Sequence, residues 1–284
     1  MKNLVFLILI SLLSNLFAQN DWITIGTDRT RSVSGIAIAG DKIVVVHDNK
    51  RDYEGRAGIV QLDQKKAAYQ TLEWPDEILP FDLEALATIP GSLTDMIAME
   101  SQGKCHLLIF DHAKMRLVYN GYIQIPGINW PTNLEGFDIM SFGQKTMAVW
   151  GHRGKSKYPG KLYWGWMDLN QKVIHPLDSL EISIPWPTEH VRHIADLKLD
   201  ESGRCWISAT SDPGDDGPFS SAIYLIGQFQ LKDNRMPFHL VTNANPVFMF
   251  KQHKVEAFEL IENGILVATD DENFGGYIKT VYFK

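Results

Sequence analysis

The chain has 284 residues and a formal net charge of −7, from 27 basic and 34 acidic side chains. This balance argues against nucleic acid as a partner, because contacts to phosphate need clustered cations. The hydrophobic share of 45% is that of an ordinary globular protein, and it provides material for a large core.

Residues 1–18, MKNLVFLILISLLSNLFA, combine a basic Lys2, an apolar run up to Leu13 and a small Ala18. This is the pattern of a secretory signal peptide. The run is too short for a transmembrane helix, which needs about 20 apolar residues. We therefore expect no membrane span, an extracytoplasmic location (periplasmic or secreted) and a mature domain over residues 19–284. Without Lys2 that domain has a net charge of −8, which suits a cationic ligand.

An isolated apolar strand, WITIG at residues 22–26, opens the mature chain without a hairpin mate nearby. Propellers often close by letting a strand from one terminus complete the blade that the other terminus builds. We expect this strand to be the fourth strand of the last repeat, beside a C-terminal strand at residues 276–283.

Five variants of one pattern follow, each an apolar strand, a turn and a second apolar strand. Residues 133–153, NLEGFDIMSFGQKTMAVWGHR, show it in full. The copies align on the residue that begins the first strand, at Ser34, Glu84, Glu135, Ala195 and Glu256. Strand repeats about 50 to 60 residues long are typical of β-propellers. We predict one all-β propeller domain with five four-stranded blades, and six blades as the alternative.

Further apolar stretches complete four strands in each repeat. The expected strands are residues 34–39, 42–47, 58–62 and 67–72 in repeat one, 84–89, 95–99, 105–110 and 117–123 in repeat two, 134–140, 146–150, 160–168 and 172–175 in repeat three, and 194–199, 205–210, 221–230 and 237–241 in repeat four. Helices should be few and short, because no stretch keeps a 3.6-residue period.

Cys105 and Cys205 are the two cysteines, and they lie in different repeats. An oxidising compartment would permit a disulfide between them. The alternative is a pair of buried thiols on separate strands. Neither cysteine has the neighbours of a zinc site of the usual spacing.

Polar residues recur where the first strand of a repeat begins and where its second strand ends. In a propeller the first strand lines the central channel and the second returns beside it, so both positions lie at one mouth of the channel. The residues expected there are Glu84, Glu135 and Glu256 at the starts, and Asp48, Glu100, His152, Arg153, Asp212 and Asp270 at the ends. His190 and His193 are interpreted as loop residues.

Carboxylates this close repel one another and raise each other's pKa unless a cation neutralises them. Oxygen ligands in such number favour calcium over zinc. Calcium is therefore the candidate cofactor, and its expected ligands are Glu84, Glu135, Glu256 and Asp270. The alternative is that these acids only form turns at a solvated surface. Glutamate is uncommon in turns and strands, which favours a functional role, and not a turn-forming one, for the three glutamates that begin strands.

A small-molecule ligand would lie on the same face. Arg153, Lys155 and Lys157 form a basic cluster suited to a phosphate or carboxylate, and an exposed charged loop is the alternative. Arg153 and His152 are the candidate catalytic residues, for charge stabilisation and proton donation. The expected ligand-binding residues are Asp48, Glu100, Lys155 and Asp212.

The motifs LEALA at 83–87, LEGF at 134–137 and VEAF at 255–258, with the strand ends MES at 99–101 and TDD at 269–271, resemble those of the esterase-like, phytase-like bacterial propellers. Residues 193–229 are similar to a blade of a related group of secreted propellers of unknown function. The resemblance implies calcium-assisted hydrolysis of phosphate esters, with carboxylates holding metal and Arg or Lys holding phosphate.

This sequence departs from that pattern at Ser34 and Ala195, which replace acids. Two hypotheses remain open. One is a calcium-assisted phosphate-ester hydrolase that acts on a small, phosphorylated molecule. The other is a non-catalytic propeller that binds a small ligand or a protein. We expect a monomer.

Overall fold

The computed structural model describes residues 22–63, 66–128, 132–232 and 235–283. Apart from two short 3₁₀ helices, η1 (Arg29–Arg31) and η2 (Glu272–Phe274), the elements in these ranges are β-strands. None of the helices described there has the length and apolar character needed to cross a membrane. The predicted signal peptide, residues 1–18, lies outside the described residues.

The strands form five antiparallel sheets. Blade one contains β2 (Gly35–Ala39), β3 (Lys42–Val46), β4 (Ala57–Asp63) and β5 (Lys66–Leu72), and blade two contains β6 (Leu83–Thr88), β7 (Asp95–Glu100), β8 (Lys104–Asp111) and β9 (Arg116–Gln124). Blade three contains β10 (Leu134–Phe142), β11 (Lys145–His152), β12 (Gly160–Asp168) and β13 (Val173–Ile182). Blade four contains β14 (Val191–Leu199), β15 (Arg204–Ser211), β16 (Ser220–Phe229), β17 (Phe238–Leu240) and β18 (Pro246–Lys251). Blade five contains β19 (Val255–Ile261), β20 (Gly264–Thr269), β21 (Gly276–Tyr282) and β1 (Ile23–Gly26).

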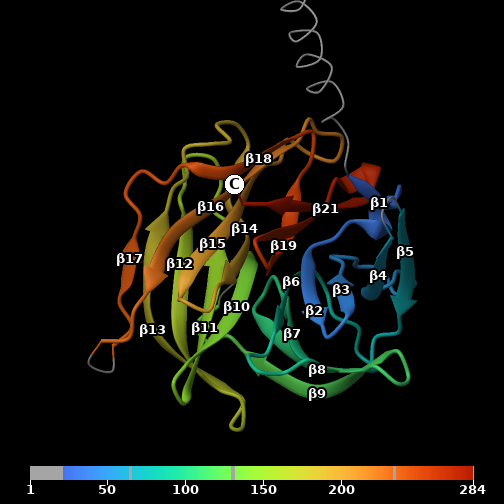
Figure 1. The fold of residues 1–284 in the computed structure, drawn as a ribbon, viewed down its shortest axis with the longest axis horizontal. Coiled ribbons are helices and arrows are strands. Elements are labelled where there is room, and N and C mark those ends of the chain that lie inside the picture. The colour runs from blue at the N-terminus through green and yellow to red at the C-terminus, as the bar shows by residue number, and fades with distance from the viewer. Residues whose placement is uncertain (1–21, 64–65, 129–131, 233–234, 284) are drawn as a thin grey trace, which may run out of the picture.

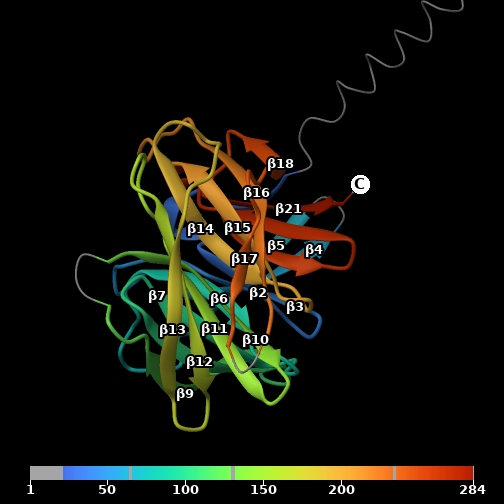
Figure 2. The same ribbon diagram turned by 90° about the vertical axis from the view of Figure 1, so that its left-hand side faces the viewer.

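The first strands of the blades, β2, β6, β10, β14 and β19, surround the centre of the molecule (Figure 1). Each of them contacts the first strands of both neighbouring blades, so the ring closes on itself. This arrangement is a β-propeller. It confirms the predicted all-β class and the count of five blades rather than six. Figure 2 views the ring from its rim, with the outer strands β13 and β17 toward the viewer.

The N-terminal strand closes the ring as predicted. β1 pairs antiparallel with β21, with Ile23 opposite Ile278 and Gly26 opposite Gly276. It is thereby the outermost strand of blade five, whose other strands come from the C-terminal end of the chain. Closure joins the two ends of the described chain within one sheet, so the ring cannot open without breaking these hydrogen bonds.

Two glycines allow the first strands to approach closely at the centre. A Cβ atom on Gly35 of β2 would lie 2.6 Å from the backbone nitrogen of Leu86 in β6. A Cβ atom on Gly136 of β10 would lie 2.7 Å from the Cβ of Leu197 in β14. Both distances are shorter than real Cβ contacts, so only glycine permits this spacing of the ring.

Blade four departs from the expected pattern at both edges. Its first strand begins at Val191 rather than at residue 194, so His193 lies in a strand and not in a loop. The outer edge is divided, because β17 pairs with one end of β16 and the unexpected β18 pairs with the other end. β16 has ten residues, and the short β17 covers only three of them, which leaves room for a second partner.

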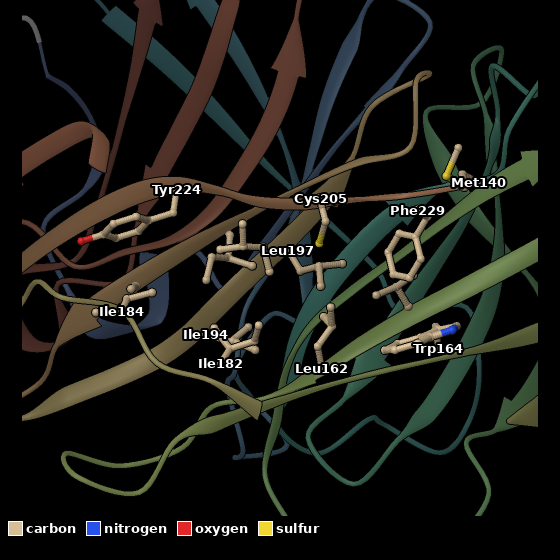
Figure 3. Packing of buried hydrophobic residues seen from close by; sticks show 14 of the residues in the cluster. Met140, Leu162, Trp164, Ile182, Ile184, Ile194, Leu197, Cys205, Tyr224 and Phe229 are labelled. Atoms are coloured by element: carbon tan, nitrogen blue, oxygen red, sulfur yellow. The ribbon is translucent and has the colours of Figure 1, made fainter. Parts of the chain in front are cut away.

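Apolar side chains fill the spaces between neighbouring blades. Figure 3 shows the largest cluster, in which Leu162 and Trp164 of blade three face Leu197, Cys205 and Phe229 of blade four. This explains why many strands are apolar on both faces. Both Cys105 and Cys205 are buried free thiols, which confirms the second of the two alternatives for them.

Candidate functional site at the channel mouth

The three glutamates predicted to begin first strands each lie at a β-bulge. The strand register shifts at Glu84 in blade two, at Glu135 in blade three and at Glu256 in blade five. A bulge leaves one residue outside the ladder of hydrogen bonds and turns its side chain in a new direction. All three bulges lie at the same end of the ring, because the neighbouring residues pair with the ends of the second strands.

The ends of the second strands meet these bulges as expected. Leu83 pairs with Glu100, Leu134 with His152, and Val255 with Thr269. The start of each first strand and the end of its second strand therefore share one mouth of the channel. We call the charged residues gathered there the mouth cluster. Its acids are Asp48, Asp82, Glu84, Glu135, Asp212, Glu256, Asp270 and Glu272, and its cations are Lys50, Arg153, Arg192 and Lys254.

Arg192 lies at the centre of the cluster, and the sequence interpretation missed it. Its Nη1 lies 3.1 Å from Glu135 Oε1 and 3.4 Å from Glu256 Oε1, and its Nη2 pairs with Asp212. Burial works against its charge, but Glu135, Glu256 and Asp212 outweigh burial and raise the pKa of Arg192. The register of β14 shifts between Arg192 and Asp196, and Arg192, which lies before this shift, supplies the charged side chain of blade four at the mouth.

Lys254 is the second missed cation. Its ammonium lies 3.4 Å from both Glu256 and Asp270 and also pairs with Glu272, and the residue is only 1% exposed. Burial raises the pKa of Asp270, but Lys254 and a hydrogen bond from Ser32 bring that pKa below its usual value. The sequence signal for Lys254 was its position two residues before the start glutamate of repeat five.

Arg153 and Glu135, which were both expected at this mouth of the channel, contact each other. Arg153 Nη1 donates to Glu135 Oε1 over 2.8 Å. The backbone fixes the position of Arg153, because its carbonyl accepts hydrogen bonds from the amides of His193 and Ile194 in blade four. Arg153 thus connects the loop after β11 to the first strand of the next blade.

Blade one supplies an acid with an unusual environment. Burial is the main cause that raises the pKa of Asp48 to about 7, and the negative charges of Asp270 and Asp82 add to this rise. Lys50 acts in the opposite direction. Lys50 Nζ lies 2.6 Å from Asp82 and 4.0 Å from Asp48, so it is engaged mainly by Asp82. Ser34, which begins the first strand of this blade, contributes no acid.

Two carboxyl groups in the cluster are poorly compensated. Burial, followed by the charges of Asp82, Glu135, Asp48 and Glu256, raises the pKa of Glu84 well above its ordinary value. Glu135 is 1% exposed, and its Oε2 has no hydrogen-bond partner among the described residues. A buried carboxylate oxygen without a donor is energetically costly.

The other predicted residues lie in several places. Glu100 faces the next strand of its own blade, where its Oε1 lies 2.6 Å from His106 Nε2. His152 is half-buried, accepts a hydrogen bond at Nδ1 from the amide of Gly154, and has a pKa that burial lowers. Asp212 belongs to the cluster, and Lys155 is exposed beside it.

A cleft of about 370 Å³ opens beside the cluster between the loops of blades three and four. Its charged lining residues are Arg153, Lys155, Arg192, Asp212, Asp215 and Glu272. The cleft gives a small molecule a route to the guanidinium groups that contact Glu135.

The predicted calcium ligands come together, but protein cations lie between them. Arg192 bridges Glu135 and Glu256, and Lys254 bridges Glu256 and Asp270. Within the described parts of the chain, no group of three or more His, Cys, Asp or Glu side chains is arranged to hold a metal ion. This arrangement does not fit a calcium site. Calcium binding stays a prediction.

A second charged group lies deeper in the channel, and the sequence interpretation missed its cation, Lys198. Lys198 of β14 donates to the carbonyls of Ile36 in blade one, at 3.1 Å, and Leu86 in blade two, at 2.5 Å. Asp196 accepts a hydrogen bond from the amide of Phe258 in blade five. These side chains tie blade four to three other blades, and we call them the interior cross-link.

Asp138 of β10 completes the interior cross-link. Its Oδ2 accepts a hydrogen bond from the amide of Leu199 in blade four over 2.6 Å. Burial raises the pKa of Asp138 to about 7, with Lys198 acting in the opposite direction. The available signal was charged residues in the middle of apolar first strands, where a soluble protein rarely places them without a partner.

This chain matches no protein-family model and no curated protein. Among solved structures it is similar to the periplasmic gluconolactonase of Pseudomonas aeruginosa, with 12% identity, a TM-score of 0.45, and coverage of 88% of this chain and 69% of that one. A GH32 β-fructofuranosidase from Bombyx mori shows 11% identity and a TM-score of 0.44, with coverage of 76% of this chain and 51% of that one.

A putative 6-phosphogluconolactonase from Bacteroides uniformis shows 11% identity and a TM-score of 0.40, with coverage of 88% of this chain and 70% of that one. This chain spans about half the length of the Bombyx mori β-fructofuranosidase. None of these proteins is a phytase by its description, so the predicted phytase-like family gains no support. Similarity this low carries no statement about activity, and the propeller fold rests on the strand topology of this chain.

Proposed function

We propose that the mouth cluster is the active site of a hydrolase that uses carboxyl groups for proton transfer near neutral pH. The observation that carries this proposal is the uneven pairing of two acids of one site. Lys254 Nζ lies 3.4 Å from Asp270, whereas Lys50 Nζ lies 4.0 Å from Asp48 and is engaged by Asp82 at 2.6 Å. Lys254 keeps Asp270 ionised, whereas burial and like charges raise the pKa of Asp48 to about 7. Environments that separate the pKa values of neighbouring carboxyl groups are typical of acid–base catalysis.

Asp48 is the proposed proton-transfer group. A pKa near 7 lets a carboxylate take a proton from an attacking water and return it to the leaving group. Arg153 is the proposed group that stabilises the negative charge developing on the substrate. It lines the cleft, and a guanidinium has five N–H donors, one of which contacts Glu135. The predicted proton donor, His152, has a lowered pKa, which favours a neutral imidazole that accepts a proton.

The finer hypothesis, calcium-assisted hydrolysis of phosphate esters, requires a further cation. The acids of the mouth cluster outnumber its cations by eight to four. A phosphate dianion would be repelled by this excess unless cations such as calcium reduced it. A neutral ester or lactone meets no such repulsion. The extracytoplasmic location is likewise proposed, from residues 1–18.

Purified protein should be assayed against neutral esters, lactones, and phosphate monoesters and diesters between pH 6 and 8, with calcium and with a chelator. For the substrate that is turned over, Asp48→Asn should lower kcat/KM by about 10²–10⁴-fold, the usual contribution of a general acid or base. Glu262→Gln, in the exposed turn at the opposite end of blade five, is the matched control and should not change the rate.

Turnover that is equal in the Asp48→Asn variant would overturn the assignment of Asp48. Turnover of phosphate esters that depends on calcium would support the finer hypothesis instead. If no substrate of the panel reacts while small ligands bind at the mouth, the non-catalytic propeller is the better description.

A further inference from the structure

We infer that the ligand of the mouth carries a protonated amine, which the carboxylates of Glu84 and Glu135 receive. This inference rests on the site of the proposed function and adds the chemical class of its substrate. The chemistry expected is an aliphatic ammonium group on a small polar molecule.

The acids of the mouth cluster are paired unevenly. Lys50 is engaged by Asp82, and Arg192 and Lys254 each contact acids of blade five. The strongest influences on Glu84, by contrast, are burial and other carboxylates. Glu84 is partly exposed, so it is the acid that an incoming cation can reach.

The two carboxylate oxygens of Glu135 differ in their contacts. Oε1 receives Arg153 and Arg192, whereas Oε2 is buried and has no hydrogen-bond partner among the described residues. An ammonium group has three N–H donors and no acceptor. One such group can therefore donate to more than one carboxylate, and it adds the positive charge that the cluster lacks.

Exposed aromatic side chains lie on the loops around the mouth. Tyr53, Phe81, Tyr158 and Phe274 are each half or more exposed. They belong to loops that open at this face, namely those before β4, β6, β12 and β21. Aromatic faces attract ammonium groups, so the rim and the carboxylates below it favour the same ligand.

The protein provides an internal example of this recognition. The ammonium of Lys50 lies 2.6 Å from the carboxylate of Asp82 and 5.7 Å from the ring centre of Phe81. A carboxylate and an aromatic ring thus already hold one primary amine at the edge of the site. The proposed ligand would be held by the same two kinds of group.

Isothermal titration of the purified protein with butylamine, butane-1,4-diamine, butan-1-ol, calcium chloride and inorganic phosphate tests the inference. The two amines should bind, whereas the alcohol and phosphate should not. Glu84→Gln should weaken amine binding at least tenfold and should still fold, because it removes a carboxyl that burial and like charges disfavour. Glu262→Gln is the control that should bind as the parent does.

Equal binding of butylamine and butan-1-ol, measured on the parent protein, would overturn the inference without any variant. Calcium binding with no amine binding would also overturn it. Amine binding without hydrolysis of any substrate would refute the proposed hydrolase and leave the inference standing. Hydrolysis of amine-free esters as fast as their amino analogues would contradict the inference alone.

Discussion

The mouth cluster and the interior cross-link occupy the same channel and contain acids with similar pKa values. Burial brings Asp48 at the mouth and Asp138 in the interior each to a pKa of about 7. Their surroundings differ. Asp138 accepts a hydrogen bond from the backbone amide of Leu199 and lies near Lys198. Asp48, by contrast, belongs to a partly exposed cluster in which acidic side chains outnumber basic ones. A raised pKa alone does not distinguish a structural acid from a functional one, but the completeness of its contacts does.

The largest expected effect separates the two regions by stability. Lys198→Met should lower the free energy of unfolding by about 3–5 kcal/mol, because it leaves buried acids and two backbone carbonyls without their cation. Urea denaturation measures the change, with Lys114→Met in an exposed turn as the control. A loss below about 1 kcal/mol would mean that the interior cross-link does not hold the blades together.

The next prediction concerns pH. Because the folded pKa of Asp48 lies above its unfolded value near 3.8, the folded state retains the proton and loses stability as the pH rises from about 4 to about 7. Asp48→Asn should therefore be more stable than the parent at pH 8. One pKa unit corresponds to about 1.4 kcal/mol, and we expect a gain of at least that size.

The folded pKa of Asp138 is also about 7, so the same linkage predicts that Asp138→Asn gains stability relative to the parent as the pH rises from 5 to 8. At pH 5 Asp138→Asn should be the more damaging of the two substitutions, because it disturbs the buried oxygen that accepts from the amide of Leu199. Thermal unfolding of both variants at pH 5 and pH 8 measures the contrast. If Asp138→Asn costs no more stability than Asp48→Asn at pH 5, the distinction between the two regions fails.

The smallest expected effect concerns the predicted ligand residue that lies outside the cluster. Glu100→Gln keeps a side-chain oxygen for the hydrogen bond with His106 and should cost about 1 kcal/mol or less. It should leave amine binding at the mouth unchanged, since Glu100 contacts its own blade. A loss of binding comparable to that of Glu84→Gln would bring Glu100 back into the site.

The repeat pattern predicted the propeller correctly because it depends on local rules. Alternation of apolar strands with turns, a spacing of about 50 to 60 residues and an unpaired strand at residues 22–26 are all readable along the chain. The divided edge of blade four was missed, since residues 246–251 pair with β16 only after a long return of the chain.

The sequence by itself determined the five-bladed ring, its closure and the convergence of Glu84, Glu135, Glu256 and Asp270 at one mouth, because strand direction places the ends of successive strands together. Only the tertiary structure decided how those acids are neutralised. Arg192 and Lys254 reach the centre through an irregular strand and a loop, and such positions follow from packing in three dimensions rather than from repeat spacing. The same holds for Lys198, whose partners lie 162 and 112 residues away in the chain.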